Sequence, residues 1–232
     1  MNSFTCILLP LLLILSGCTS SQGLHVESLQ RTLQEEEARF ADVQPATSAP
    51  NPLPGQGPPK LGLYVVPTGF LRHEFEWTDA DRETLLTWAH GLQRDGLISG
   101  ALLIPNASLQ GNTLSPLLES AARYGADILL VVAGAAAVDR YNNYKGPLLY
   151  WTILGAYFAN GTHSDALCLV RGSVWDVRTR TLRSSEETEG RAQTVGPAAF
   201  VDDQTMVLLA RQEALATLLP ALKARGLRPR TP

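Results

Sequence analysis

Short apolar runs alternate with amphipathic segments between residues 60 and 133, which is typical of a chain that packs helices on a sheet. The apolar runs predict three strands, at residues 61–66, 101–104 and 128–133. Pro67 and Pro105 end the first two runs. The third run is apolar at every position, as expected of a central strand that is covered on both faces.

Two amphipathic segments between these runs, and a third near the carboxyl end, predict helices. The first covers residues 78–96, where Thr78 is placed to cap the helix and acidic residues follow in the first turn. The second covers residues 115–125, with a proline in its first turn. The third covers residues 203–226, with a wide leucine stripe and a kink expected at Pro220.

The chain between the second and third helices departs from simple alternation. Residues 166–177 and 182–191 predict two strands joined by a polar turn. The apolar stretch 147–159 precedes them, and the pair Asn160-Gly161 after it predicts a hairpin turn. The expected fold class is α/β (α+β sandwich), with a mixed sheet of about five to six strands and about three helices. The expected order is β-α-β-α-β-β-β-β-α.

Aromatic side chains are concentrated between residues 141 and 158. This segment holds six of the sixteen aromatic residues (four Trp, six Tyr and six Phe). Two interpretations stay open: a buried strand with its lead-in loop, or an exposed surface for a protein or lipid partner, where aromatic side chains are favoured anchors. The candidate binding residues are Tyr141, Tyr144, Tyr150, Trp151 and Tyr157.

The amino-terminal residues predict export and membrane anchoring. Residues 7–15 form an apolar run that fits a signal peptide and is shorter than the ~20 residues needed to cross a bilayer. The tetrapeptide Leu15-Ser16-Gly17-Cys18 resembles a bacterial lipobox, which implies cleavage before Cys18 and acylation of Cys18. Thr19 stands where Asp would imply inner-membrane retention, so resemblance to sorted lipoproteins implies the outer membrane. The alternative is an ordinary cleaved secretory signal in which Cys18 is incidental.

A Pro-rich spacer is expected between the anchor and the domain. Residues 24–43 predict a short helix with a thin apolar stripe, and residues 45–59 contain six prolines and predict an extended linker. At about 3.1 Å per residue, such a linker would hold the domain about 45 Å from the membrane. The expected organisation is a signal peptide (1–17), a lipid anchor plus Pro-rich spacer (18–59), a single α/β domain (60–227) and a short tail (228–232).

Charge and residue spacing argue against nucleic-acid binding, metal binding and catalysis. The net charge of −3 is too small to predict a nucleic acid as partner. The histidines lie at no metal-ligand spacing, and Cys168 lies in an apolar run, where we expect a buried and inert thiol. Asp165, Asp176 and the acidic residues of 186–189 are expected at turns or strand edges. The expectation is a protein without cofactor or metal that is not an enzyme.

Several segments together resemble the rhombotarget (rhombotail) lipoproteins. The segments are Tyr150-Trp151-Thr152-Ile153-Leu154-Gly155-Ala156-Tyr157, Gly161 and Val174-Trp175-Asp176-Val177-Arg178-Thr179-Arg180. The similarity covers about residues 60–191. This family is defined by anchoring and processing, so the resemblance implies an envelope lipoprotein and no specific activity.

The strand order also resembles a wider group of α/β periplasmic domains. These are the domains of the curli-secretion lipoprotein, of the penicillin-binding-protein activator lipoproteins and of the amino-terminal part of the Tol translocation protein. They bind proteins and are not enzymes, although a fold by itself does not set a function. The resemblance implies an outer-membrane-anchored, periplasm-facing lipoprotein that binds an envelope protein. A subunit of an oligomeric secretion or pore complex, and a hydrolase of unrecognised type, are the alternatives.

Overall fold

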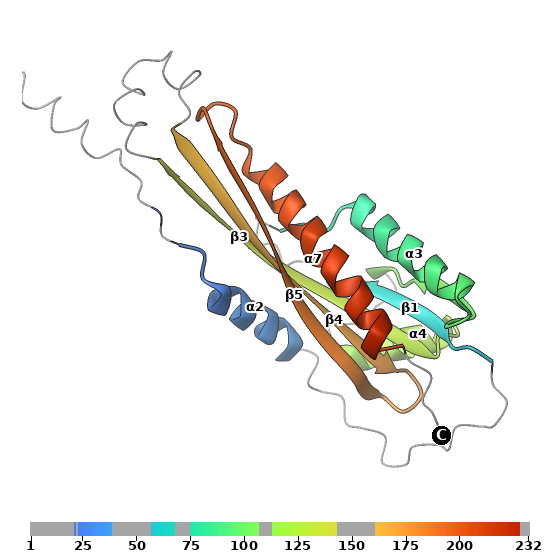
Figure 1. Ribbon diagram of the computed structural model, residues 1–232. Helices are drawn as coiled ribbons and strands as arrows, with labels where there is room; N and C mark the ends of the chain where they lie inside the picture. Colours follow the sequence, from blue (N-terminus) through green and yellow to red (C-terminus); the bar gives the residue numbers. More distant parts are fainter. Residues whose placement is uncertain are drawn as a thin grey trace, which may run out of the picture.

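The computed structural model describes residues 21, 23–38, 57–67, 75–106, 113–142 and 161–227. Within them, a five-stranded mixed sheet carries helices on both faces, which confirms the predicted class (Figure 1). The described elements are α2 (Val26–Ala38), β1 (Lys60–Val65), α3 (Asp79–Arg94), β2 (Gly100–Leu103), α4 (Leu114–Arg123), β3 (Ile128–Asn142), β4 (Thr162–Asp176), β5 (Thr181–Gly196) and α7 (Asp203–Arg225).

The sheet combines parallel and antiparallel pairing in the order β2-β1-β3-β4-β5. β1 pairs in parallel with β2 on one side and with β3 on the other, because α3 and α4 return the chain to the start of each next strand. β3, β4 and β5 pair antiparallel over almost their whole lengths. These three strands continue well beyond the end of β1, and we call them the long ribbon.

The predicted starts of α3 and α4 are confirmed to within a residue. Thr78 N donates to Asp81 Oδ2 at 2.7 Å, and Asp81 N donates to Thr78 Oγ1 at 3.3 Å, which forms a capping box at the start of α3. The helix predicted from residue 115 begins at Leu114. Pro116 lies in its first turn, where a missing N–H costs no helical hydrogen bond.

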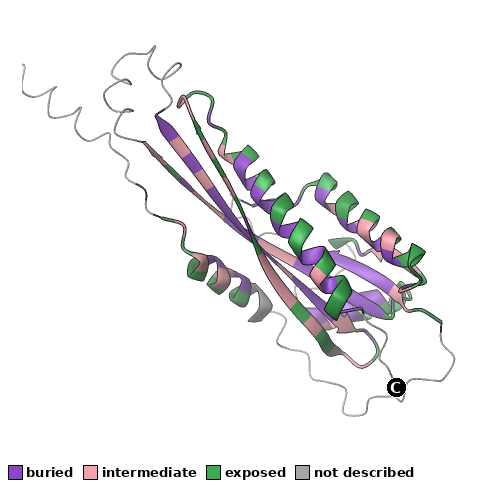
Figure 2. Ribbon diagram, viewed as in Figure 1, coloured by how far each residue is buried: buried purple, intermediate pink, exposed green. Residues whose placement is uncertain are grey.

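α3 and α7 cover one face of the sheet and form the larger core with it (Figure 2). Among the described helices, α7 alone is long and apolar enough to cross a bilayer by length and composition. Half of that stretch is buried within the protein, so it serves here as a core helix. Cys168 of β4 is fully buried in this core, and burial raises the pKa of its thiol to about 12. The predicted buried thiol is thus confirmed.

α4 and α2 cover separate parts of the other face. α4 packs over β1 and β3, while α2 packs farther along the long ribbon. Leu29 and Leu33 of α2 are 5% and 1% exposed and join a cluster with Ala135, Leu167 and Leu169 of β3 and β4. The sequence analysis assigned this helix to the spacer, whereas the structure packs it on the sheet. Its thin stripe is sufficient because the helix meets the apolar side chains of Ala135, Leu167 and Leu169.

The long ribbon extends farther than the sequence pattern predicts. β3, expected to end at Ala133, continues to Asn142. The small residues 134–137 have little strand propensity, and this hides the strand from sequence analysis. A Cβ atom at Gly134 would lie 2.4 Å from Phe75 Cζ, so glycine lets that ring pack directly on the strand backbone.

The stretch predicted as a strand at residues 147–159 lies outside the described residues, as does Asn160 of the predicted turn. Within the described residues β3 pairs directly with β4, from Ile128 opposite Asp176 to Asn142 opposite Thr162. The chain between β3 and β4 therefore leaves and rejoins the sheet at one end of the long ribbon.

Candidate functional site

The candidate site is the end of the long ribbon at which the chain passes from β3 to β4. We call it the ribbon end. Tyr141, the one predicted binding residue within the described ranges, belongs to it. The described pieces lie together at one end of the molecule (Figure 1). They are residues 139–142 of β3, 162–165 of β4, 193–196 of β5 and the β5–α7 turn, residues 197–202.

The amino-terminal segment is hydrogen-bonded to the ribbon end. The carboxylate of Asp139 accepts from Ser21 Oγ and, at 2.9 Å, from Gly23 N. Gly23 has a φ of +77°, a left-handed conformation that glycine adopts without strain. Asp139 is only 8% exposed, and a charged acceptor shielded from water makes stronger hydrogen bonds. The chain is thereby attached to the sheet only three residues after Cys18.

Tyr141 is a half-buried part of the sheet surface. Its ring stacks on that of His163, with 4.9 Å between centroids and an interplanar angle of 7°. Its hydroxyl donates to Asp165 Oδ2 at 3.2 Å. Burial, followed by this hydrogen bond, raises the pKa of Tyr141. Asp165 therefore acts as an acceptor within the strand pair, and Tyr141 presents only part of its ring to a partner.

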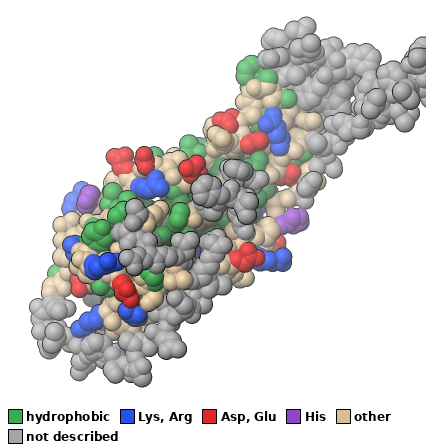
Figure 3. All heavy atoms as spheres, turned by 180° about the vertical axis from the view of Figure 1, so that it is seen from behind, with side chains coloured by type: hydrophobic (Ala, Val, Ile, Leu, Met, Phe, Trp, Pro, Cys, Tyr) green, Lys and Arg blue, Asp and Glu red, His purple; other side chains and the backbone are tan. Residues whose placement is uncertain are grey.

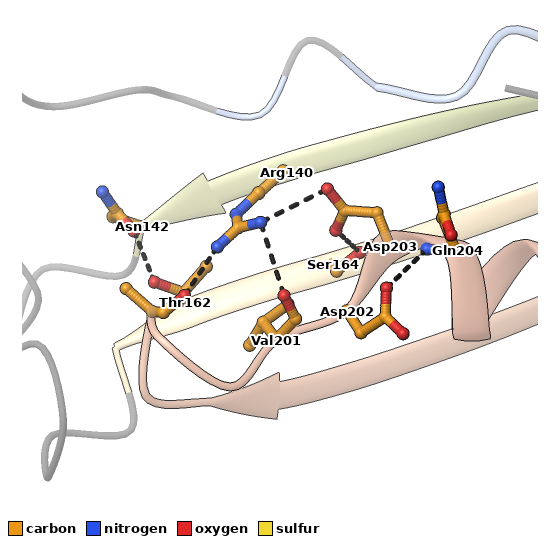
Figure 4. A network of polar contacts seen from close by, with 9 residues as sticks. Arg140, Asn142, Thr162, Ser164, Val201, Asp202, Asp203 and Gln204 are labelled. Atoms are coloured by element: carbon orange, nitrogen blue, oxygen red, sulfur yellow. Dashed lines mark hydrogen bonds and ion pairs between the residues drawn. The ribbon is translucent and has the colours of Figure 1, made fainter. Parts of the chain in front are cut away.

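A polar network on the opposite face of the ribbon end fixes the β5–α7 turn to the strands (Figure 4). Arg140 Nη2 donates to Ala198 O at 2.8 Å, and Arg140 Nη1 lies 3.3 Å from Asp203 Oδ2. Ser164 Oγ donates to Asp203 Oδ1 at 2.6 Å. Asp203 is the first residue of α7, where a carboxylate also faces the positive end of the helix dipole. The turn is therefore held in a defined position.

The last residues of β5 and the β5–α7 turn expose apolar side chains. Residues 195–201 carry no charge. Phe200 is 69% exposed, the highest value for a large hydrophobic side chain among the described residues, and Val195 is 50% exposed. The view from behind shows hydrophobic side chains at the upper tip of the described part (Figure 3). Single exposed apolar residues are common on protein surfaces and are not by themselves evidence of a site. Val195 and Phe200 are considered because both lie at the ribbon end.

The opposite end of the long ribbon is charged. Asp176 accepts from Arg183 and, at 3.0 Å, from Thr179 N, in agreement with its predicted role at a turn. Burial acts to raise the pKa of Asp176, but the hydrogen bonds from Arg183 and Thr179 outweigh it and lower the pKa. Arg178 is exposed in this β4–β5 turn, and Arg180 follows it. The two ends of the ribbon thus differ in chemistry.

The acidic residues of β5 are paired with arginines. The ion pairs are Glu186 with Arg225 at 2.9 Å, Glu187 with Arg171 at 2.6 Å and Glu189 with Arg191 at 3.5 Å. In the part of the chain that the structure describes, no group of three or more His, Cys, Asp or Glu residues is placed to hold a metal ion. These acids form a charge-paired strand surface, of the kind that protects a sheet edge.

The other predicted site residues lie outside the described residues. They are Cys18, Tyr144, Tyr150, Trp151 and Tyr157. The last four are located between Asn142 and Gly161, and both of these flanking residues are at the ribbon end. The sequence analysis did not single out Asp139, Val195 or Phe200. The charge-free run around Phe200 was a visible signal, but only the strand register places it at the end where Ser21 is attached.

No protein-family model matches the sequence, and no curated protein matches it. Solved structures with a similar chain path include a dodecamer of a PelC variant from Paraburkholderia phytofirmans, at 15% identity and a TM-score of 0.33, covering 75% of this chain and 95% of that one. Lipoprotein GNA1162 from Neisseria meningitidis is 13% identical with a TM-score of 0.34, covering 72% and 99%. The hypothetical protein CT253 from Chlamydia trachomatis is 12% identical with a TM-score of 0.38, covering 72% and 97%. These values assign neither a family nor a function to the chain, and the rhombotarget resemblance stays a prediction.

Proposed function

We propose that this chain is a lipoprotein anchored to the outer membrane by acylated Cys18, and that its periplasm-facing α/β domain binds an envelope protein. The observation that carries the proposal is the lipobox-like tetrapeptide followed, after three residues, by the hydrogen bonds from Ser21 and Gly23 to Asp139. A connection of only three residues suits an acylated cysteine, because it would keep the same end of the domain near the membrane.

Binding, in preference to catalysis, is supported by the way the reactive side chains are used. The Cys168 thiol is buried, with a pKa of about 12, so it stays protonated near neutral pH. His163 stacks on Tyr141, and Asp165 accepts the hydrogen bond of that tyrosine. These three groups do not assemble a nucleophile with a base.

The anchor is tested by growing cells with an alkyne-bearing palmitate analogue and separating inner from outer membranes. The wild-type chain is expected to take up the label and to fractionate with the outer membrane, because two or more acyl chains give a stable anchor. Cys18→Ala is the matched control and is expected to lose both properties. An unlabelled wild-type chain, or a Cys18→Ala chain that keeps the label, contradicts the anchor.

Protein binding is tested with a photo-crosslinking amino acid in living cells. Placed at Tyr144, Tyr150 or Tyr157, the crosslinker is expected to give adducts with another protein, because aromatic residues are favoured anchors at interfaces. Glu83, exposed on α3, is the control position. If the aromatic positions give no adducts, or if Glu83 gives equally strong ones, the aromatic segment is not the binding surface. Either result leaves the proposed anchor untouched.

A second candidate function, a subunit of an oligomeric secretion or pore complex, is favoured by the position of β5. This strand is sixteen residues long and lies at one edge of the described sheet. An edge strand presents backbone groups that another chain can pair with, and the charged side chains along β5 oppose such pairing unless the partner complements them. Light scattering of a soluble form that begins at Thr19 separates the two functions. A ring-sized mass would favour the oligomeric complex, and a monomer or dimer the tethered binding domain.

A further inference from the structure

The hydrogen bonds of Ser21 limit how far the ribbon end can lie from an acylated Cys18. Three residues of fully extended chain span at most about 11 Å. Ser21 Oγ and Gly23 N both donate hydrogen bonds to Asp139, which belongs to β3. The three residues therefore bridge the distance between Cys18 and the sheet. An acylated Cys18 is held at the level of the lipid headgroups. Asp139, and with it the ribbon end, must then lie close to the bilayer surface.

The Pro-rich segment has a different role in this geometry from the one predicted for a spacer. It follows α2, which packs on the sheet, and precedes β1, which is one of the strands of that sheet. Residues 45–59 therefore connect two parts of one folded body and do not separate the body from the anchor. The distance of about 45 Å that an extended linker would span is not added between membrane and domain.

The chemistry of the ribbon end fits a bilayer surface. The charge-free run 195–201 holds the most exposed large hydrophobic residue described, Phe200, together with exposed Val195. Phenylalanine is among the apolar residues that membrane-surface segments bury at the boundary between headgroups and acyl chains. The guanidinium of Arg140 is paired with Asp203, and three hydrogen bonds link this pair to the turn and to Ser164. The turn can therefore meet lipid without unpairing Arg140 and Asp203. The exposed carboxylate of Asp202, the one charged group within the turn, accepts from Gln204 N at 3.0 Å.

The opposite end exposes a single large apolar side chain, Leu182 at 45%, beside charged residues, and it lies far away. It carries the exposed Arg178 and the ion pair between Arg183 and Asp176. β3 alone is fifteen residues long, which corresponds to about 50 Å at ~3.3 Å per residue. The two ends can therefore be distinguished by any measurement of proximity to lipid.

We propose that the ribbon end is a membrane-facing surface on which the β5–α7 turn rests, with Phe200 in the headgroup region of a phospholipid bilayer. This inference rests on the proposed acylation of Cys18. It assigns the long axis of the domain a direction: the ribbon end toward the membrane, and the β4–β5 turn toward the periplasm.

The test uses the full mature lipoprotein, reconstituted into vesicles of phosphatidylethanolamine and phosphatidylcholine that contain a lipid with a nitroxide on its headgroup. An environment-sensitive fluorophore is attached to Phe200→Cys or Val195→Cys at the ribbon end. Arg178→Cys in the β4–β5 turn and Glu83→Cys on α3 are matched exposed controls. Cys168 is buried and does not compete for the label, which the unsubstituted protein verifies.

Labels at residues 200 and 195 are expected to lose fluorescence to the nitroxide and to shift to shorter wavelength, whereas labels at 178 and 83 keep their intensity. Equal quenching at the ribbon end and at residue 178, in protein that is acylated and floats with the vesicles, overturns the orientation and leaves the anchor standing. Mass spectrometry of the amino-terminal peptide is the independent check. An unmodified Cys18 overturns the proposed function instead.

Discussion

Arg211 shows how one residue joins two helices. It is 3% exposed on α7, and its Nε lies 3.1 Å from Asp81 Oδ1 in the first turn of α3. Its Nη1 donates to the carbonyl of Glu76, and its guanidinium lies 5.5 Å from the centre of the Phe75 ring. Asp81 also accepts from Thr78 in the capping box. Desolvating two charges offsets much of their attraction, so such a pair contributes more to the position of α3 on α7 than to net stability.

Removing only the cation should be costly. Arg211→Met leaves the Asp81 carboxylate buried without its partner, and we expect the free energy of unfolding to fall by about 3–5 kcal/mol. Urea unfolding of the soluble form that begins at Thr19 measures this change.

The double variant Asp81→Asn/Arg211→Met is the control, because the introduced amide still accepts from Thr78 but carries no charge. We expect it to recover a large part of the loss. If the double variant were as unstable as Arg211→Met, the uncompensated carboxylate would not be the cause.

At the scale of elements, glycines decide how closely helices approach the strands. A Cβ atom at Gly190 of β5 would lie 2.0 Å from Ala210 O and 2.6 Å from Ala214 N, both in the backbone of α7. Nearby, Thr188 Oγ1 donates to Ala214 O at 2.9 Å. α7 therefore packs directly on the backbone of β5, and the missing side chain is what makes room for it.

Gly190→Ala should force α7 away from β5. Because the obstructing atoms are backbone, they cannot rotate aside, and we expect a loss of about 3 kcal/mol or more. Gly91→Ala in α3 is the matched control, since the nearest atom there, Arg94 Nη2, is 3.9 Å away. It should raise stability by about 0.5–1 kcal/mol. Thermal and urea unfolding of both variants test this contrast, and equal stabilities would show that β5 and α7 are not in close contact.

At the scale of the whole molecule, α2 adds a helix to the face of the long ribbon opposite α7 (Figure 1). Its attachment depends on Leu29 and Leu33, and on a hydrogen bond from Gln30 Nε2 to Glu187 Oε1 at 3.1 Å. With Ser21 and Gly23 on Asp139, the amino-terminal segment is joined to the sheet at two places. The described part of the amino-terminal segment, Ser21 and residues 23–38, is therefore part of the folded domain.

Leu33→Ala should loosen α2 while the rest of the sheet stays folded. Truncating a fully buried leucine typically costs about 2–5 kcal/mol, and here the loss is confined to a small cluster of its own. Hydrogen exchange is expected to accelerate in residues 26–38 and to stay unchanged in β3 and β4. Arg31→Ala, exposed on the same helix, is the control. Unchanged exchange in α2 after Leu33→Ala would mean that this stripe does not hold the helix.

The local features of the chain were determined by its sequence alone. The capping box at Thr78, the buried run around Cys168 and the part of the α7 leucine stripe from Leu215 to Leu222 follow from hydrogen bonding and apolar periodicity among residues close in the chain. The same periodicity locates the strands and helices along the chain, and their order predicts a mixed sheet covered by helices. The lipobox-like tetrapeptide at Cys18 is likewise a local pattern, and it predicts the anchor without any structure.

Only the tertiary structure decided where the segment that follows Cys18 meets the domain. Ser21 and Asp139 are 118 residues apart in the chain, and no local propensity relates them. The register of the long ribbon brings Phe200 to the same end, and glycines and alanines of low strand propensity allow α2, α7 and Phe75 to pack closely. Such contacts depend on the shapes of distant surfaces after they have been brought together. Periodicity along the chain therefore carries no information about them.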